Sequence, residues 1–272
     1  MIISEIIISL SNQRIFLACV LVIVLALTTW RANLKLTKPL LIASFRLIIQ
    51  LSLVGLILEY VFEINNLLPV ALIAMVMLLV AGREVSVRQK YRISGRWSYG
   101  IGTSSMFVSS FAVSVFGLAA IIRADNWWEP RYSIPVLGML LGNTMTAVAL
   151  SLDRFTTYVW ERREIIEAKL LLGHTSKEAL NTILRDSLRA GLMPVINSMA
   201  IAGIVSLPGM MTGQILAGNS PNDAVRYQIV IWLLIAAGCG FGSILVVKMD
   251  ANRVFDERQR LRIDRIYKVL WS

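Results

Sequence analysis

The chain has 272 residues, 56% of them hydrophobic, and a mean hydropathy of +0.67. Soluble domains rarely exceed about 50% apolar residues, and the excess here lies in runs close to the roughly 20 residues that span a bilayer. The composition therefore excludes an ordinary soluble domain and predicts an all-α, polytopic helical membrane protein. The net charge of +10 would suit a nucleic-acid partner, so the positions of the charges must decide.

Seven apolar stretches are expected to cross the membrane as one transmembrane domain over residues 1–272. They cover approximately residues 14–30, 39–61, 66–82, 98–122, 133–152, 190–206 and 221–248. With these spans, 22 of the 27 Lys and Arg residues fall on one side of the membrane. Such asymmetry obeys the positive-inside rule. It predicts a multi-pass protein of the cell (inner or plasma) membrane, with the N-terminus outside, the C-terminus cytoplasmic and no nucleic-acid partner.

The sequence contains no recognisable catalytic or metal-binding motif. The two cysteines, Cys19 and Cys239, lie in separate apolar spans, and His174 is the single histidine. No His/Cys cluster suggests zinc or haem, and no glycine-rich phosphate loop, His-Glu-x-x-His or Gly-x-Ser-x-Gly motif is present. We therefore expect a chain that is not an enzyme, binds no cofactor of its own and offers no identifiable metal ligands.

The second span carries an arginine and a glutamine, Arg46 and Gln50, four residues apart. This spacing places them on one helix face. An arginine within a span is costly unless it snorkels to the headgroups, pairs or faces water. Two interpretations follow: Arg46 is structural, or both residues line a polar path.

Small residues recur at intervals of four in the fifth and last spans. Gly138 and Gly142 form one pair, and Gly238 and Gly242 the other. This pattern permits close helix approach and indicates a tightly packed bundle. Asn143, next to the first pair, would need a polar partner in a dry bundle.

The long loop over residues 153–189 is predicted to lie in the cytosol and to contain two amphipathic helices. Gly173 is suited to end the first helix, because glycine readily adopts the left-handed conformation. Thr175 and Glu178 have the spacing of a capping box that begins the second. The apolar stripes of these helices must bury against something, and the membrane surface, the protein's own helices and a partner are all open.

The sixth span contains Pro194, Asn197 and Ser198 and is expected to stop at Pro208, because proline cannot continue the hydrogen-bond ladder. The apolar segment that follows, residues 209–218, is too short to cross a membrane. Broken backbone at membrane depth survives only where protein or a wet cavity satisfies it. The segment is therefore predicted to be re-entrant or to line a lumen.

Several of these stretches resemble known transporter permeases. Glu167, Ala168 and Gly173 are similar to an abbreviated form of the Glu-Ala-Ala…Gly loop of ABC importers. Residues 39–248 more specifically resemble the family of FetB-type iron-exporter permeases and plant aluminium-tolerance permeases. The matching stretches are Arg46-x-x-x-Gln50-Leu51, Gly138-Met139-x-x-Gly142-Asn143-x-Met145, residues 169–218 with Ser206-Leu207-Pro208-Gly209-Met210-Met211 as the most specific run, and residues 224–229.

The resemblance implies an ABC-transporter permease that forms a homodimer and binds two copies of a separate ATPase subunit, which would hold ATP and Mg²⁺. It favours docking of that subunit on the loop around Gly173. The residues expected to couple to the ATPase are Glu164, Glu167, Ala168, Leu171, Gly173, His174 and Thr175. The residues expected along the cargo pathway are Arg46, Gln50, Asn143, Met145, Asn197, Ser198, Met210, Met211 and Gln214. The family implies iron or a related metal species as cargo, with a chelate or a sugar nucleotide as alternatives.

Other classes of function remain to be weighed. An ion-coupled secondary transporter or a channel would usually need titratable groups within its spans, where Arg46 is the clearest and Glu59 lies near a helix end. An intramembrane enzyme would need a nucleophile and base or a metal pair, and the spans offer neither. A scaffold or accessory membrane protein is a fourth reading.

Overall fold

The computed structural model describes residues 12–64, 66–94, 97–122, 126 and 128–268. The chain divides into two compact units, residues 1–65 with 213–220 and residues 66–212 with 221–272, and each is described by itself. The prediction of one transmembrane domain stays a prediction. The predicted position of the N-terminus concerns residues 1–11, which lie outside the described residues.

The first unit contains a helical hairpin of α1 (Asn12–Arg31) and α2 (Thr37–Ile64). The connection turns through Asn33 and Lys35, which both have positive φ angles, 54° and 56°. The hydroxyl groups of Thr29 and Thr37 lie 3.1 Å apart and join the facing helix ends. Arg46 and Gln50 are both exposed on α2, one helical turn apart.

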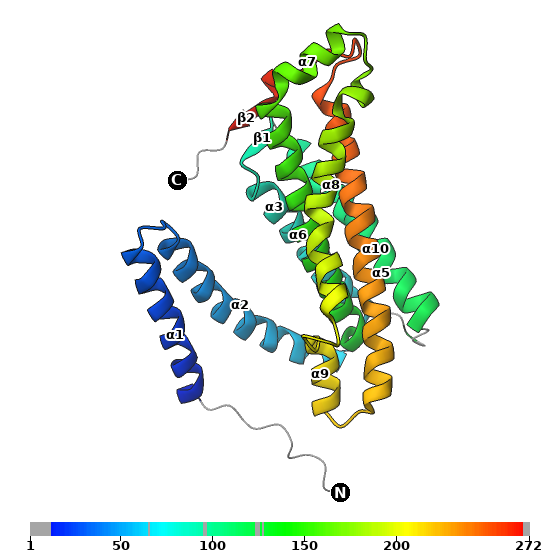
Figure 1. Ribbon diagram of the computed structural model, residues 1–272. Helices are drawn as coiled ribbons and strands as arrows, with labels where there is room; N and C mark the ends of the chain where they lie inside the picture. The colour runs from blue at the N-terminus through cyan, green and yellow to red at the C-terminus, as the bar shows by residue number, and fades with distance from the viewer. Residues whose placement is uncertain (1–11, 65, 95–96, 123–125, 127, 269–272) are drawn as a thin grey trace, which may run out of the picture. The chain divides into compact units, whose positions relative to one another are not determined.

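The second unit is a helical bundle built around α6 (Figure 1). This long helix packs against α3, α8 and α10. Fully buried side chains along it belong to two hydrophobic core clusters, Val148 and Phe155 to the main cluster and Leu140 to a second one. The helices of this unit are α3 (Leu67–Val87), α4 (Trp97–Met106), α5 (Ala112–Phe116), α6 (Pro130–Glu161), α7 (Arg163–Leu171), α8 (Ser176–Ile201) and α10 (Pro221–Val254), with π-helical turns η1 (Phe107–Phe111) and η2 (Gly117–Ile122) on either side of α5.

The closest helix contact lies at a glycine that the spacing pattern did not single out. A Cβ atom on Gly191 of α8 would collide with the Ser151 hydroxyl and the Ala147 carbonyl of α6. On α10, Gly242 likewise packs against the methyl group of Thr144, which a Cβ would approach to 2.9 Å. Gly142, by contrast, has open space where a Cβ would lie. The expectation of tight packing is therefore correct for Gly242 and wrong for Gly142.

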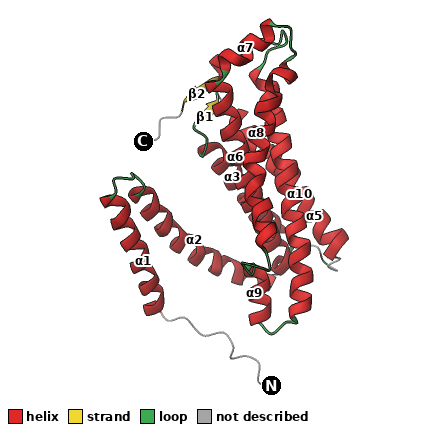
Figure 2. Ribbon diagram, in the orientation of Figure 1, coloured by secondary structure: helices red, strands yellow, loops and turns green. Residues whose placement is uncertain are grey.

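A two-stranded antiparallel sheet ties the C-terminal segment to the bundle (Figure 2). Strand β1 (Tyr91–Ile93) pairs with β2 (Ile266–Lys268), which follows the short helix η3 (Ile263–Arg265). The ring of Tyr91 stacks on Trp160 of α6 with centroids 5.3 Å apart. The Thr156 hydroxyl donates to the Tyr91 carbonyl at 2.9 Å. The sheet is therefore fastened to α6 by one aromatic and one polar contact.

Within the described residues, six helices are long and apolar enough to cross a membrane. They are Gln13–Arg31, Thr37–Ile64, Leu67–Val87, Tyr99–Ile121, Pro130–Glu161 and Pro221–Val254. The sixth predicted span, residues 190–206, is not among them, so the expected count of seven is not confirmed. Residues 190–201 form the second half of α8, which begins in polar sequence at Ser176. The prediction instead ended a cytosolic helix and began a membrane helix at residue 190.

The predicted interruption after α8 is present, and it begins earlier than expected. The helix ends at Ile201, seven residues before Pro208. Gly203 has a φ of +82° and donates its N–H to the Ser206 carbonyl at 2.9 Å. The chain becomes helical again in α9 (Gly209–Leu216). The break therefore starts at the extended residue Ala202 and the left-handed Gly203, well before the proline.

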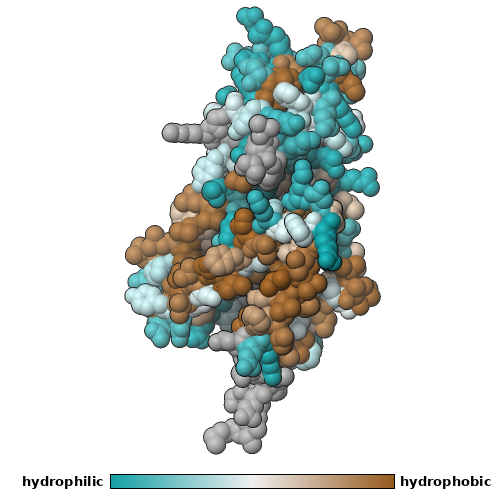
Figure 3. Space-filling model, turned by 90° about the vertical axis from the view of Figure 1, so that its left-hand side faces the viewer, coloured by the Kyte–Doolittle hydropathy of each residue, from teal (hydrophilic) through white to brown (hydrophobic). Residues whose placement is uncertain are grey.

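The hydropathy of the surface differs between parts of the molecule. Figure 3 shows mostly hydrophilic side chains around α7 and a broad hydrophobic area over α1 and α2. Exposed apolar side chains on the candidate spans include Leu79, Phe107, Leu233 and Phe241. This distribution is that of a polytopic helical membrane protein with one polar end.

Candidate coupling hairpin and substrate pathway

The connection between α7 and α8 is a sharp turn fixed by glycine. Gly173 has a φ of +89°. Its N–H donates to the Leu170 carbonyl at 3.0 Å, and the N–H of His174 donates to the Lys169 carbonyl at 3.1 Å. These two bonds are those of a Schellman motif, which satisfies the last carbonyls of a helix. The prediction that Gly173 ends the first helix is confirmed.

The next helix begins with the predicted capping box. The backbone N–H of Glu178 donates to the Thr175 hydroxyl oxygen at 3.3 Å, and Thr175 N–H donates back to Glu178 Oε2 at 2.8 Å. The Thr175 backbone N–H, followed by its hydroxyl, holds the pKa of Glu178 below its ordinary value of 4.5. Local hydrogen bonds between residues 169 and 178 therefore close both helix ends at the turn between α7 and α8. We call residues 163–180 the coupling hairpin.

One apolar side of the coupling hairpin is buried in the protein itself. Ile166, Ala179 and Leu180 are each no more than 2% exposed and belong to the main hydrophobic core. The inner apolar stripe of the hairpin therefore packs against the protein's own helices, one of the three surfaces considered for it. The tip is different, because Leu171 and Leu172 are 89% and 79% exposed.

All residues expected to couple to an ATPase are exposed on this hairpin. They are Glu164, Glu167, Ala168, Leu171, Gly173, His174 and Thr175. His174 Nδ1 lies 3.9 Å from the Glu178 carboxylate, next to the turn. The hairpin thus presents an apolar tip flanked by polar and charged groups on a rigid turn, which is a suitable geometry for contact with another protein.

The C-terminal segment contributes a neighbouring surface that sequence reasoning missed. A groove of about 570 Å³ is lined on one side by Glu167, Leu171 and His174. The other side is formed by residues 258–261, which follow α10. Gln259 Oε1 accepts a hydrogen bond from the backbone N–H of Ser176 at 3.1 Å. No motif marked Gln259, and its φ of +57°, unusual for this residue type, is visible only in the structure.

A single aspartate holds this C-terminal turn in place. Asp256 Oδ1 accepts from the backbone N–H groups of Arg258 and Arg260 at 3.0 and 2.8 Å. Its second oxygen accepts from Arg260 Nε at 2.7 Å. These bonds, the Arg260 backbone N–H first, hold the pKa of Asp256 below its ordinary value of 3.8. Aspartate is well suited to such turns because its short side chain reaches the following backbone.

The structure brings only some of the predicted pathway residues together. Asn143 and Ser198 line the same small cavity, of about 80 Å³, between α6, α8 and α10. The Asn143 amide donates to the Met139 carbonyl of its own helix at 2.8 Å. Met145 lies elsewhere, against the main core.

The remaining predicted pathway residues lie in three other parts of the structure. Met211 lines a larger cavity beside the break after α8, while Met210 packs against the second core cluster. Asn197 is exposed on α8. Arg46, Gln50 and Gln214 belong to the first unit. In the described part of the chain, no group of three or more His, Cys, Asp or Glu side chains is placed to hold a metal ion.

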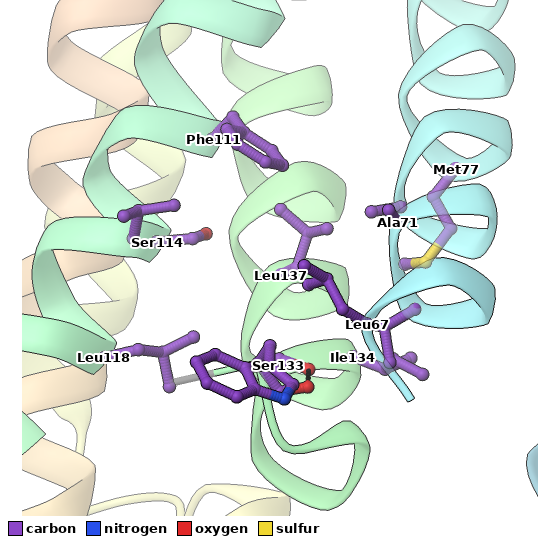
Figure 4. A pocket seen from close by; sticks show the side chains of 13 residues that line it. Leu67, Ala71, Met77, Phe111, Ser114, Leu118, Ser133, Ile134 and Leu137 are labelled. Carbon is purple, nitrogen blue, oxygen red and sulfur yellow. Dashed lines mark hydrogen bonds between the residues drawn. The ribbon is translucent and has the colours of Figure 1, made fainter. Parts of the chain in front are cut away.

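Another cavity, of about 160 Å³, lies between α3, α5 and α6 (Figure 4). Leu67, Phe111 and Leu137 form its walls. Ser114 and Ser133 lie beside it, but its surface is apolar, and the Ser133 hydroxyl donates to the Trp128 carbonyl at 3.2 Å. A lining of this kind offers nothing to bind a charged cargo.

The geometry and the hydropathy together define a polytopic membrane protein with one structured polar end. The model of the family described as "Uncharacterised protein family (UPF0014)" matches residues 12–255, and the chain belongs to this family. The predicted resemblance to the FetB-type permeases is confirmed by the relatives below.

Three relatives indicate the range of this family. The UPF0014 membrane protein slr1647 of Synechocystis sp. is 36% identical over 243 residues, 88% of this chain and 91% of the relative. The "Probable iron export permease protein FetB" of Escherichia coli is 31% identical over 265 residues, 96% and 98% of the two chains. The protein ALUMINUM SENSITIVE 3 of Arabidopsis thaliana is 29% identical over 231 residues, 84% and 81%. No solved structure shows a significant match.

Proposed function

We propose that this chain is the membrane-spanning subunit of an ABC transporter that exports iron or a related metal species. Two copies would form the membrane part, and each would bind one copy of a separate ATPase that holds ATP and Mg²⁺. The protein would lie in the inner or plasma membrane, with its polar end on the cytoplasmic side. A relative named as a probable iron export permease, similar over nearly the whole chain, supports the transport class.

The observation that carries the proposal is the exposed leucine tip of the coupling hairpin. Leu171 and Leu172 project from a turn whose two helix ends are fixed by hydrogen bonds. Exposed apolar groups on a rigid support, rimmed by polar ones, are typical of protein contacts. Because α7 continues from α6 and α8 follows the turn, a force on this tip would reach two helices of the bundle.

The proposal is tested by changing the tip and asking whether an ATPase stays bound. The affinity-tagged full chain is purified from its own cells, and co-purifying proteins with a phosphate loop are identified by mass spectrometry. We expect a short ATPase with the unaltered chain. We expect the double variant Leu171→Glu and Leu172→Glu to lose it, because the carboxylates would have to be desolvated in the contact.

Tyr267→Glu is the matched control, because Tyr267 is exposed at the same end of the bundle, on β2. It should retain the ATPase. Membrane insertion and elution volume should be the same for all chains. Retention of the ATPase by the double variant, with unchanged ATP turnover, would show that the hairpin is not the coupling element. Cellular iron that is the same with and without this protein would remove iron as the cargo.

A further inference from the structure

A polar pocket of about 520 Å³ lies between the last turn of α10 and the segment that follows it. Its lining contains four arginines and two carboxylates, which leaves a net charge of +2. These charged residues are Arg253, Arg258, Arg260, Arg265, Asp256 and Glu257. A concave surface with an excess of one charge attracts ions of the opposite sign. Arginine is well suited to bind phosphate, because its guanidinium can donate two parallel N–H bonds to the oxygens.

The charges within the pocket are only partly compensated. Asp256 Oδ2 accepts from Arg260 Nε at 2.7 Å, and Asp256 Oδ1 accepts from two backbone N–H groups. Within the described ranges, the other three arginines of the pocket form no ion pair. Three positive charges therefore remain against the single carboxylate of Glu257.

Two of these three arginines are held in place by uncharged groups. The central carbon of the Arg253 guanidinium lies 4.9 Å from the centre of the Trp97 ring. Arg265 Nη1 donates to the Arg253 carbonyl at 2.8 Å. Contacts of this kind order a guanidinium without neutralising it, and the guanidinium of Arg265 has further N–H groups for a ligand. An anion would therefore meet arginines whose side chains are already ordered, which lowers the entropic cost of binding.

The contact with Trp97 also indicates the level of the pocket relative to the membrane. Arg253 belongs to the last turn of the candidate span Pro221–Val254, and Trp97 precedes the candidate span Tyr99–Ile121 by two residues. Trp97 is 55% exposed, and tryptophan at the end of a span typically lies among the lipid headgroups. The pocket is therefore expected beside the phosphate groups of the adjoining leaflet, where basic pockets bind anionic headgroups.

We propose that this pocket binds the phosphate group of an anionic phospholipid in the leaflet at the polar end of the bundle. The phosphate lies among Arg253, Arg258 and Arg265, and the acyl chains lie along the span that begins after Trp97. A soluble anion would meet the same arginines but would gain no contact with that span. The proposal is independent of the cargo and of the ATPase, because it requires only that the polar end adjoins a membrane.

The binding test counts lipids on the purified full chain by native mass spectrometry, with phosphatidylglycerol as the anionic probe and phosphatidylcholine as the zwitterionic one. We expect one phosphatidylglycerol to bind more tightly than all others, and phosphatidylcholine to show no such preferred site. Arg258→Gln should weaken this site roughly fivefold, the usual contribution of one basic side chain near an anionic lipid surface. Glu257→Gln, one residue away, should strengthen the site by a similar factor, because it removes the carboxylate that repels the phosphate.

Two further variants separate a specific site from general attraction by charge. Arg185→Gln is the matched control, because Arg185 is exposed on α8 at the polar end and does not line the pocket. It removes the same charge as Arg258→Gln and should leave the preferred site unchanged. Arg253→Lys keeps the charge but loses the planar fork of N–H groups, so it should weaken the site. Elution volume and thermal unfolding of each variant should match those of the unaltered chain.

Three results would overturn the proposal. Equal binding of phosphatidylglycerol by the unaltered chain, Arg258→Gln and Glu257→Gln would place the lipid elsewhere. An equal loss in Arg185→Gln and Arg258→Gln would mean that only net charge matters. Displacement of phosphatidylglycerol by inorganic phosphate at the same concentration would make the pocket a site for soluble anions.

Discussion

Gln259 accepts a hydrogen bond from the backbone N–H of Ser176 at 3.1 Å, across 83 positions of sequence. Ser176 is the first residue of α8, where backbone N–H groups lack a partner within the helix. The bond therefore ties the turn that follows α10 to the start of α8. Because α7 follows α6 directly, the coupling hairpin is connected to three long helices, α6, α8 and α10.

This connection predicts the effect of removing the Gln259 side chain. Gln259→Gly loses the acceptor, while glycine adopts the φ of +57° without strain. We expect faster hydrogen exchange at the Ser176 amide and little change in global stability. The control Arg258→Ala alters an exposed side chain of the same turn and should leave that exchange rate unchanged. Unaltered protection of Ser176 in Gln259→Gly would mean that the two segments are not joined in solution.

Gly191 is predicted to be the least substitutable glycine of the bundle. Gly191→Ala would drive a methyl group into the Ser151 hydroxyl and the Ala147 carbonyl on α6. Overpacking of this kind costs about 1–3 kcal/mol. The measurement is thermal unfolding of the detergent-solubilised chain. Gly142→Ala is the matched control, because open space lies where its Cβ would be and alanine is the better helix former. Equal transition temperatures for the two variants would contradict the α6–α8 contact.

Two adjacent threonines on α6 should respond oppositely to the same substitution. The Thr156 hydroxyl lies 2.9 Å from the carbonyl oxygens of both Tyr91 and Leu152 and can donate to either, whereas the buried hydroxyl of Thr157 has no partner within the described ranges. Thr156→Val should destabilise the protein by about 1 kcal/mol, and Thr157→Val should be neutral or stabilising, because a lone buried hydroxyl is itself a cost. The free energy of unfolding and the protease sensitivity of the C-terminal strand are measured. A larger loss of unfolding free energy in Thr157→Val than in Thr156→Val would mean that Thr157, not Thr156, has the stabilising hydrogen bond.

The capping box predicts a pH dependence for the start of α8. The pKa of Glu178 is lower in the folded hairpin than its ordinary value of 4.5. Its ionised form therefore stabilises the hairpin fully above that ordinary value, and this contribution is lost as the pH falls through the folded pKa. Hydrogen exchange over residues 176–180 should show the loss in the unaltered chain below about pH 4.5, the ordinary value.

Glu178→Gln separates titration from shape, because the amide oxygen can still accept the Thr175 hydrogen bonds but does not ionise. The advantage of the unaltered chain over this variant should be present at pH 7 and disappear in acid. Glu257→Gln, on the exposed C-terminal turn, should keep the full pH response. An identical acid response in the unaltered chain and Glu178→Gln would assign the titration to another group.

The sequence by itself determined those features that depend on composition or on neighbours within a few residues. Long apolar runs predicted six of the helices that can cross a membrane. Gly173 and the pair Thr175 and Glu178 predicted the turn of the coupling hairpin, because their hydrogen bonds span five residues or fewer. The break near Pro208 is also a local feature, because a proline cannot continue a helix. The end of α8 at Ile201 has no such local signal and was not predicted.

Only the tertiary structure decided which distant groups meet. The bond from Ser176 to Gln259, the fit of Gly191 against Ser151, and the contact of Arg253 with Trp97 each join segments that no spacing rule relates. The sixth predicted span is not confirmed for a related reason: residues 190–201 continue a helix that starts in polar sequence and packs against α6 and α10. Packing between helices depends on the shape of both surfaces, and that information is spread over the whole chain.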